Sequence, residues 1–185
     1  YTSERARMKV EALCEKLTDW CGSIVFYCVP FTELQEALRD NCPEELFTVL
    51  MRRLMVKIAN RICAANDYGA IITGESVAQV ASQTLPAIFC TNAAAEYPVF
   101  RPVIGMDKRE IVDVARHIDT FEVSTLPYED CCTVFSPKHP KTRPSLEEIL
   151  AAEASFDFEP LIEKAVRETE VKQFKYGVRN VDLDM

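Results

Sequence analysis

Apolar positions in the first twenty residues recur with the period of a helix. Ala6, Val10, Leu13 and Leu17 are spaced three or four residues apart and follow the pair Thr2-Ser3. This pattern predicts an amphipathic helix of about four turns that begins at a serine or threonine cap.

Three shorter apolar runs have the length of strands. Ile24–Val29 and Tyr68–Thr73 are apolar almost throughout, which is typical of strands covered on both faces in a parallel sheet. Val99–Val103 is also strand-like, but Pro102 removes a backbone donor and therefore predicts an edge strand.

Helical patterns or capping signals separate these runs. Helices are predicted to begin near Thr32, Pro43, Ser76, Asp107 and Ser145. The second of them runs to about Asn66, and the last helical region ends by Gly177 after a break near Pro160. Strands that alternate with helices predict an α/β fold with a doubly wound parallel sheet, which binds ligands beyond the carboxyl ends of its strands.

Composition narrows the class of protein. The 185 residues, 48% of them hydrophobic, suffice for one folded domain, and no apolar run approaches the ~20 residues of a membrane span. Eight cysteines and no secretory signal favour the reducing cytoplasm. Only two histidines and no Cys-x-x-Cys pair argue against a metal site. The net charge of −8 makes the chain alone a poor nucleic-acid binder.

One candidate ligand site follows the second predicted strand. Gly74 permits an unusual backbone conformation, and the helix expected after it would offer free N–H groups to a phosphate. Gln83 would read a base or ribose, or lie on a solvated face. Arg52 and Arg53 interrupt an apolar helix surface, so one would point to solvent and the other would reach a phosphate, with surface charge as the default interpretation. Glu75 would repel phosphate and is expected to hold a cation or a neighbouring backbone group instead.

The second candidate is the pair Cys131-Cys132 in the polar stretch 127–140. Two adjacent cysteines between acids and prolines cannot both face a core, so at least one thiol should be presented. Acids before the pair oppose thiolate formation and basic residues between 138 and 143 favour it, so a nucleophile and a purely structural pair both stay open. Lys108, in the first turn of a predicted helix, is expected to be exposed.

Together these stretches resemble one family. The resemblance runs from residue 1 to about residue 144 and includes Thr73–Ser76, Gln79–Thr84, Arg101–Lys108 and Pro127–Pro140. It is to the C-terminal adenylating domain of tRNA 4-thiouridine synthetases, also called ThiI proteins. The resemblance implies a pyrophosphatase-loop (PP-loop) ATPase fold of the adenine-nucleotide alpha-hydrolase type.

The resemblance also implies an activity. Such enzymes are ATP-dependent tRNA sulfurtransferases, which adenylate a tRNA uridine and replace its oxygen with persulfide sulfur to give 4-thiouridine. A role in thiamine synthesis is left open. ATP, with Mg²⁺, is expected at Arg52, Gly74 and Gln83. Lys108 and Cys132 fall on positions important for catalysis, and Cys131 is a second thiol. A cysteine desulfurase is the expected sulfur donor, and tRNA is expected to bind mainly through an N-terminal region.

The chain departs from the family pattern in one respect. The phosphate-cradling Ser-Gly-Gly-x-Asp-Ser loop is not in this sequence, so residues 1–144 are expected to form a partial PP-loop domain, inactive alone, and residues 145–185 a helical extension. The absence of the first strands predicts either a rearranged three-stranded sheet or a homodimer that pairs the open edges. The alternative function is a non-catalytic binding or regulatory module that retains the fold.

Overall fold

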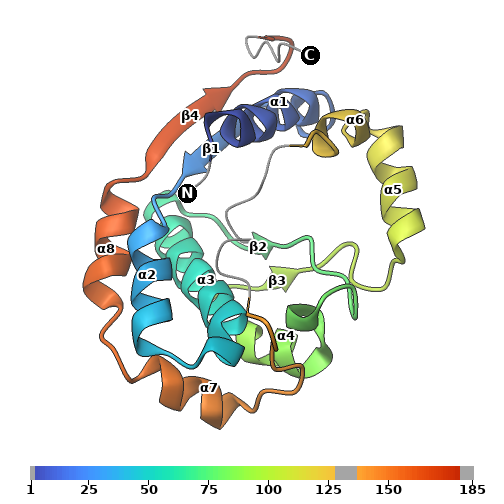
Figure 1. Ribbon diagram of the computed structural model, residues 1–185. Helices are drawn as coiled ribbons and strands as arrows, with labels where there is room; N and C mark the ends of the chain where they lie inside the picture. The colour runs from blue at the N-terminus through green and yellow to red at the C-terminus, as the bar shows by residue number, and fades with distance from the viewer. Residues whose placement is uncertain (1–2, 128–136, 180–185) are drawn as a thin grey trace. The chain divides into compact units, whose positions relative to one another are not determined.

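The computed structural model describes residues 3–127 and 137–179, and Figure 1 labels its helices and strands. The chain divides into two compact units. Unit 1 combines the stretch that ends at Cys28 with the stretches that begin at Asp107 and Thr169, and unit 2 contains the residues between them.

Unit 1 is built from three helices and two strands. In chain order these are α1 (Glu4–Cys21), β1 (Ile24–Cys28), α5 (Lys108–His117), α6 (Phe121–Ser124) and β4 (Glu170–Phe174). Unit 2 contains α2 (Thr32–Asn41), the 3₁₀ turn η1 (Glu44–Leu46), α3 (Phe47–Asn66), β2 (Ile71–Ile72), the 3₁₀ turn η2 (Ala81–Gln83), α4 (Leu85–Asn92), β3 (Val99–Phe100), α7 (Leu146–Glu153) and α8 (Glu159–Arg167).

Helix α1 begins as its sequence predicts. Ser3 is the N-cap, and its Oγ accepts a hydrogen bond of 3.1 Å from the Ala6 amide. Glu11 on α1 forms ion pairs with Arg7 at 3.1 Å and with Lys172 of β4 at 2.5 Å. The pair with Lys172 connects α1 to the strand farthest from it in sequence.

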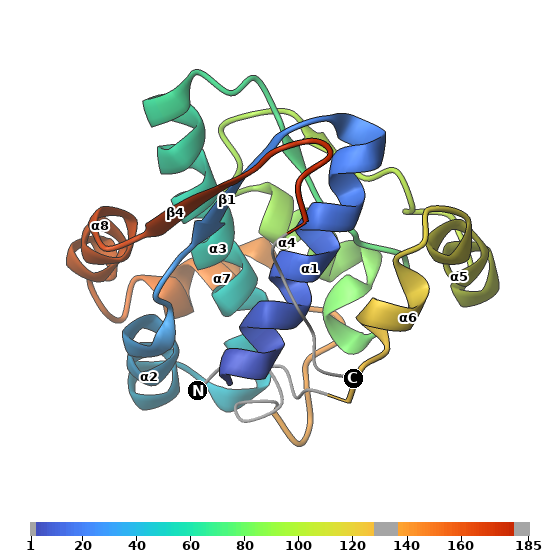
Figure 2. The same ribbon diagram turned by 90° about the horizontal axis from the view of Figure 1, so that it is seen from above.

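Strand β1 lies antiparallel to β4, as Figure 2 shows from above. Ile24 is opposite Phe174, and the rings of Phe26 and Phe174 make an edge contact at 6.1 Å. The prediction of a helical region up to Gly177 is therefore wrong at its end, because residues 170–174 form a strand. Strand β1 needs backbone partners, and β4 supplies them.

Helix α3 forms the centre of unit 2. Leu50 and Leu54 on this helix are fully buried, and α2 and α8 pack against it (Figure 1). Ile149 of α7 and Ile162 of α8 belong to the same apolar core. The segment after residue 145 thus contributes to this core, while the expected division of the chain at residue 144 stays a prediction.

The described strands form two small sheets in a mixed α/β chain. Strands β2 and β3 pair in parallel, with Ile71 opposite Val99, while β1 and β4 pair separately. The parallel pair agrees with the sequence prediction. The rearranged three-stranded sheet is wrong for the described residues, because β1 pairs with β4 in a separate antiparallel sheet. The doubly wound sheet stays a prediction.

The helix expected at Ser76 begins nine residues later, at Leu85. Ser76 does not cap a helix, and its Oγ donates a 2.7 Å hydrogen bond to the Met106 carbonyl. Thr84 is the cap instead, accepting a 3.3 Å hydrogen bond from the Ala87 amide, and Pro86 occupies the first turn. This proline favours a helix start because the first turn needs no amide donor.

The helix starts predicted near Thr32 and Asp107 differ in how they are capped. Helix α2 begins after Phe31 with no side-chain cap, so the capping box expected at Thr32 is not formed. Asp107 caps α5 in a complete capping box with Glu110, as predicted. Across residues 3–127 and 137–179, no helix combines the length and the apolar character needed to cross a bilayer.

Candidate nucleotide site

The loop that follows β2, residues 74–83, closes on itself. The Oε1 atom of Gln83 accepts a hydrogen bond of 3.1 Å from the Ser76 amide, and the Ala78 amide donates to the Gln83 carbonyl at 3.0 Å. Ala78 has a positive φ of 64°, which is uncommon for alanine. Gln83 Nε2 has no hydrogen-bond partner within the described ranges and therefore remains available to a ligand.

Arg52 extends from α3 to this loop. Its Nη2 lies 2.9 Å from Glu75 Oε1, and its Nη1 donates to Ser82 Oγ at 3.4 Å. Arg52 is thus held at the candidate site and is not a free surface charge. The neighbouring Arg53 is buried elsewhere, with Nε 2.6 Å from Glu153.

Glu75 is buried beneath the loop, with 1% of its surface exposed. Its Oε2 accepts hydrogen bonds from Arg101 Nε at 2.6 Å and from Thr73 Oγ1 at 2.9 Å. The prediction that Glu75 holds a cation is confirmed, and two guanidinium groups pair with it. Two positive charges against one negative charge leave an excess positive charge, which favours an anionic ligand.

Gly74 contributes space and not an unusual conformation. Its φ is not positive, and a Cβ built on it would meet no atom within 4 Å. The conformational argument for this glycine is therefore wrong. The prediction that a helix start offers free N–H groups here is also wrong, because no helix starts at Ser76. Open space beside Gly74 still permits a ligand to approach the backbone.

The other predicted residues belong to the other unit or lie outside the described residues. Lys108 is exposed at the first position of α5 and belongs to unit 1, whereas Arg52, Gly74 and Gln83 belong to unit 2. Cys131 and Cys132 lie outside the described residues. The structure therefore brings together the three residues predicted to bind nucleotide and places none of the predicted sulfur chemistry.

Six other cysteines are described, and burial raises the thiol pKa of four of them, Cys14, Cys42, Cys63 and Cys90. A raised pKa lowers the thiolate fraction and hence the reactivity. Cys63 and Cys90 are buried, whereas Cys21 is exposed. The four thiols with a raised pKa are therefore poor candidates for carrying sulfur.

Sequence reasoning missed Arg101 as part of the site. Arg101 follows β3, the parallel neighbour of β2, so both strands bring their next residues to the same edge. Its Nη2 also donates to Asn92 Oδ1 at 3.1 Å, which anchors the guanidinium. A polar residue directly after each of two adjacent parallel strands was the available signal.

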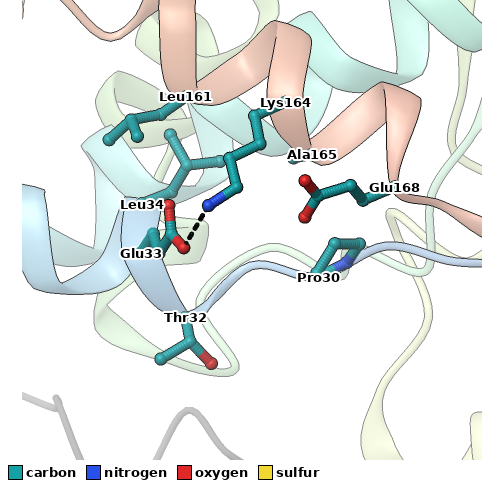
Figure 3. Close-up of a pocket in the computed structure, with 8 residues that line it drawn as sticks. All are labelled: Pro30, Thr32, Glu33, Leu34, Leu161, Lys164, Ala165 and Glu168. Atoms are coloured by element: carbon teal, nitrogen blue, oxygen red, sulfur yellow. Dashed lines mark hydrogen bonds and ion pairs between the residues drawn. The ribbon is translucent and has the colours of Figure 1, made fainter.

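A hollow of about 110 Å³ lies between α2 and α8, away from this loop in sequence (Figure 3). Lys164 points across it to Glu33, with Nζ 2.6 Å from Oε1, and Glu168 also lines it. The ammonium is already neutralised by a carboxylate of the same hollow. The Lys164 ammonium is therefore less available to bind a phosphate than the two arginines around Glu75 are.

A mixed α/β fold in which polar side chains follow two adjacent parallel strands belongs to the α/β class, whose ligands bind at that edge of the sheet. The chain belongs to the thiamine biosynthesis protein (ThiI) family, whose sequence profile matches residues 1–158.

Curated relatives are similar over nearly the whole chain. A probable tRNA sulfurtransferase of Alkaliphilus metalliredigens is 53% identical over 173 residues, which cover 94% of this chain and 44% of the relative. A probable tRNA sulfurtransferase of Brevibacillus brevis is 45% identical over 185 residues, covering 100% of this chain and 46% of the relative. The chain thus spans less than half the length of these relatives.

One solved structure is similar in fold and sequence. It is the crystal structure of a 4-thiouridine synthetase–RNA complex with bound ATP, which aligns with a TM-score of 0.89 and 33% identity. The alignment covers 95% of this chain and 46% of that one.

Proposed function

We propose that this chain is part of an ATP-dependent tRNA sulfurtransferase that adenylates a tRNA uridine and replaces its oxygen with persulfide sulfur, giving 4-thiouridine. The observation that carries the proposal is the family match over residues 1–158, within which Arg52 and Gln83 converge on one loop. The full-length protein, meaning a version that spans the whole length of the relatives, would perform the reaction. This chain alone would be inactive.

The residues around the loop suit ATP. The Arg52–Arg101 pair provides excess positive charge for phosphate, Gly74 leaves open space, and Gln83 Nε2 is a donor for a base or ribose. Bound with Mg²⁺, ATP would supply the activation that turns the uridine oxygen into a good leaving group. The complete doubly wound PP-loop sheet would form only in the full-length protein, with residues 145–185 as its extension.

The sulfur step is assigned to residues near the middle of the chain. Cys132 would carry the transferable sulfur or resolve the resulting disulfide, with Cys131 as its partner, and Lys108 would stabilise charge on the departing phosphate. A cytoplasmic cysteine desulfurase would provide the persulfide, and regions outside this chain would bind most of the tRNA. The same sulfur could serve the thiamine thiazole.

Calorimetry with ATP and a tRNA thiolation assay test the proposal in the full-length protein. We expect Arg52→Ala to weaken ATP binding by about tenfold or more, because a charged hydrogen-bond donor is lost. Arg61→Ala is the matched control, since Arg61 lies on the same helix but pairs with exposed Glu159 at 2.8 Å. Unchanged ATP affinity in Arg52→Ala would remove Arg52 from the site.

The cysteines are separated by single substitutions in the same thiolation assay. Loss of thiolation in Cys132→Ser alone supports the assignment, and loss in Cys131→Ser alone reverses the two roles. Full thiolation in both variants would contradict the sulfur mechanism. Full thiolation in the arginine and cysteine variants alike would mean that the residues of this chain are not needed for catalysis. That result would favour the alternative, in which this chain is a non-catalytic binding or regulatory module of the full-length protein.

A further inference from the structure

The buried carboxylate of Glu75 links two arginines, Arg52 and Arg101. We propose that Glu75 is a positioning residue, which fixes the Arg52 guanidinium in the orientation that receives the phosphates of ATP. This inference rests on the proposed function. Glu75 itself would touch no substrate.

The two oxygens of Glu75 have different environments. Oε2 accepts two hydrogen bonds, from Arg101 Nε and Thr73 Oγ1. Oε1 is buried and accepts no hydrogen bond from the described residues, although Arg52 Nη2 lies 2.9 Å away as an ion pair. One oxygen is therefore anchored by hydrogen bonds, and the other forms the close ion pair that holds Arg52.

Arg101 forms the fixed end of this arrangement. Its guanidinium contacts Glu75, Asn92 Oδ1 at 3.1 Å and the Val99 carbonyl at 3.5 Å. These partners lie on α4 and β3, so Glu75 is held by secondary structure and not by the loop alone. Because Glu75 is held in place, its ion pair with Arg52 in turn fixes the position of that guanidinium.

Exposure increases from Glu75 to the two arginines that it pairs with. The side chain of Glu75 is 2% exposed, that of Arg101 15% and that of Arg52 22%. The more exposed guanidinium is thus that of Arg52, which contacts Glu75 Oε1 through Nη2 and Ser82 Oγ through Nη1 and has further N–H groups for an anion. Arg101 compensates the carboxylate charge, so Glu75 orients Arg52 without cancelling the attraction for phosphate.

The first test needs no ATP. In the full-length protein, the reaction of Arg52 with phenylglyoxal is measured by mass spectrometry for wild type, Glu75→Gln and Glu153→Gln. Glu153 is the matched control, because it is also a carboxylate held by two cations, Arg53 and Lys57, away from this loop. We expect Arg52 to react several-fold faster only in Glu75→Gln. An unchanged rate at Arg52 would overturn the inference.

The second test is a double-mutant cycle on ATP affinity. Glu75→Gln should weaken binding by about tenfold, and it should add nothing in the Arg52→Ala background, since it acts through that arginine. Equal additional loss in that background would overturn the inference, because it would mean an independent role. If Glu75→Gln does not fold, Arg101→Lys keeps the charge but loses the planar fork, and should shift both readouts in the same direction by less.

The outcomes separate this inference from the proposed function. If Arg52→Ala weakens ATP binding and Glu75→Gln does not, the positioning role fails alone. If wild-type full-length protein binds no ATP, the proposed function fails and the positioning role fails with it.

Discussion

Arg52 and Arg53 are neighbours on α3 with different roles. Arg52 turns to the loop after β2, while Arg53 is 3% exposed and bonds to Glu153 and to the Cys90 carbonyl at 2.5 Å. Two adjacent residues on a helix point about 100° apart, so identical side chains reach different partners. Residue type alone could not distinguish the arginine of the site from the arginine of the core.

The Glu153 carboxyl gives a pH prediction. Burial by itself raises its pKa, but hydrogen bonds from Arg53 and Lys57 outweigh burial and hold the pKa below its ordinary value. Because the folded pKa is lower than the unfolded one, the contribution to stability is present above the unfolded pKa. It is lost as pH falls through the folded pKa.

We therefore expect Glu153→Gln to lower the free energy of unfolding by about 2 kcal/mol at neutral pH and by much less under acid conditions. Urea unfolding across this pH range measures the difference. Glu163→Gln, on the exposed face of α8, is the control and should change little. A loss that is the same at both ends of the pH range would contradict the assigned ionisation.

At the scale of elements, α5 depends on its cap more than on packing. None of its residues is classed as buried, and Asp107 Oδ1 accepts hydrogen bonds from the amides of Arg109 at 2.8 Å and Glu110 at 2.9 Å. A short helix with little burial is marginal without such local interactions. The same helix carries Lys108 at its first position.

Asp107→Ala should destabilise α5 by about 1 kcal/mol, since the cap is lost. Faster amide exchange across Lys108–His117, with a small change in global melting temperature, is the expected observation. Asp113→Ala is the matched control, because its pairing with Arg116 is exposed and long, at 3.9 Å. Similar exchange rates in both variants would mean that the cap does not hold this helix.

At the scale of the whole molecule, the parallel pair β2–β3 is unusually exposed. Ile72 is 70% exposed and Phe100, its partner across the pair, is 58% exposed. Parallel strands are ordinarily covered on both faces, and a two-stranded sheet is marginal by itself. We expect this apolar face to be covered in the full-length protein.

Ile72→Lys tests the covering. In the 185-residue chain it should change the free energy of unfolding little, whereas in the full-length protein it should cost about 2 kcal/mol. Val171→Lys, at a 61% exposed position of β4, controls for placing lysine in a strand. Urea unfolding of both lengths is the measurement, and equal effects of Ile72→Lys in the two lengths would show that the face stays open.

The sequence by itself determined the features that depend on nearby residues. The Ser3 cap of α1, the long α3, the Asp107 capping box and the strand-like run at Ile71 all follow from periodicity and capping within a few residues. The family resemblance also singled out Arg52 and Gln83, which the structure brings to one loop, while their role in nucleotide binding stays a prediction. Local hydrogen bonds and side-chain spacing contain enough information for such predictions.

Only the tertiary structure decided which distant groups meet. Strand β1 pairs with β4 from the far end of the chain, Ser76 bonds to Met106 where a helix start was predicted, and Arg101 reaches Glu75 across 26 residues. The sequence pattern contains no signal for a particular distant partner. Backbone and carboxylate groups must be paired once buried, and the partner is whichever group the packing brings within reach.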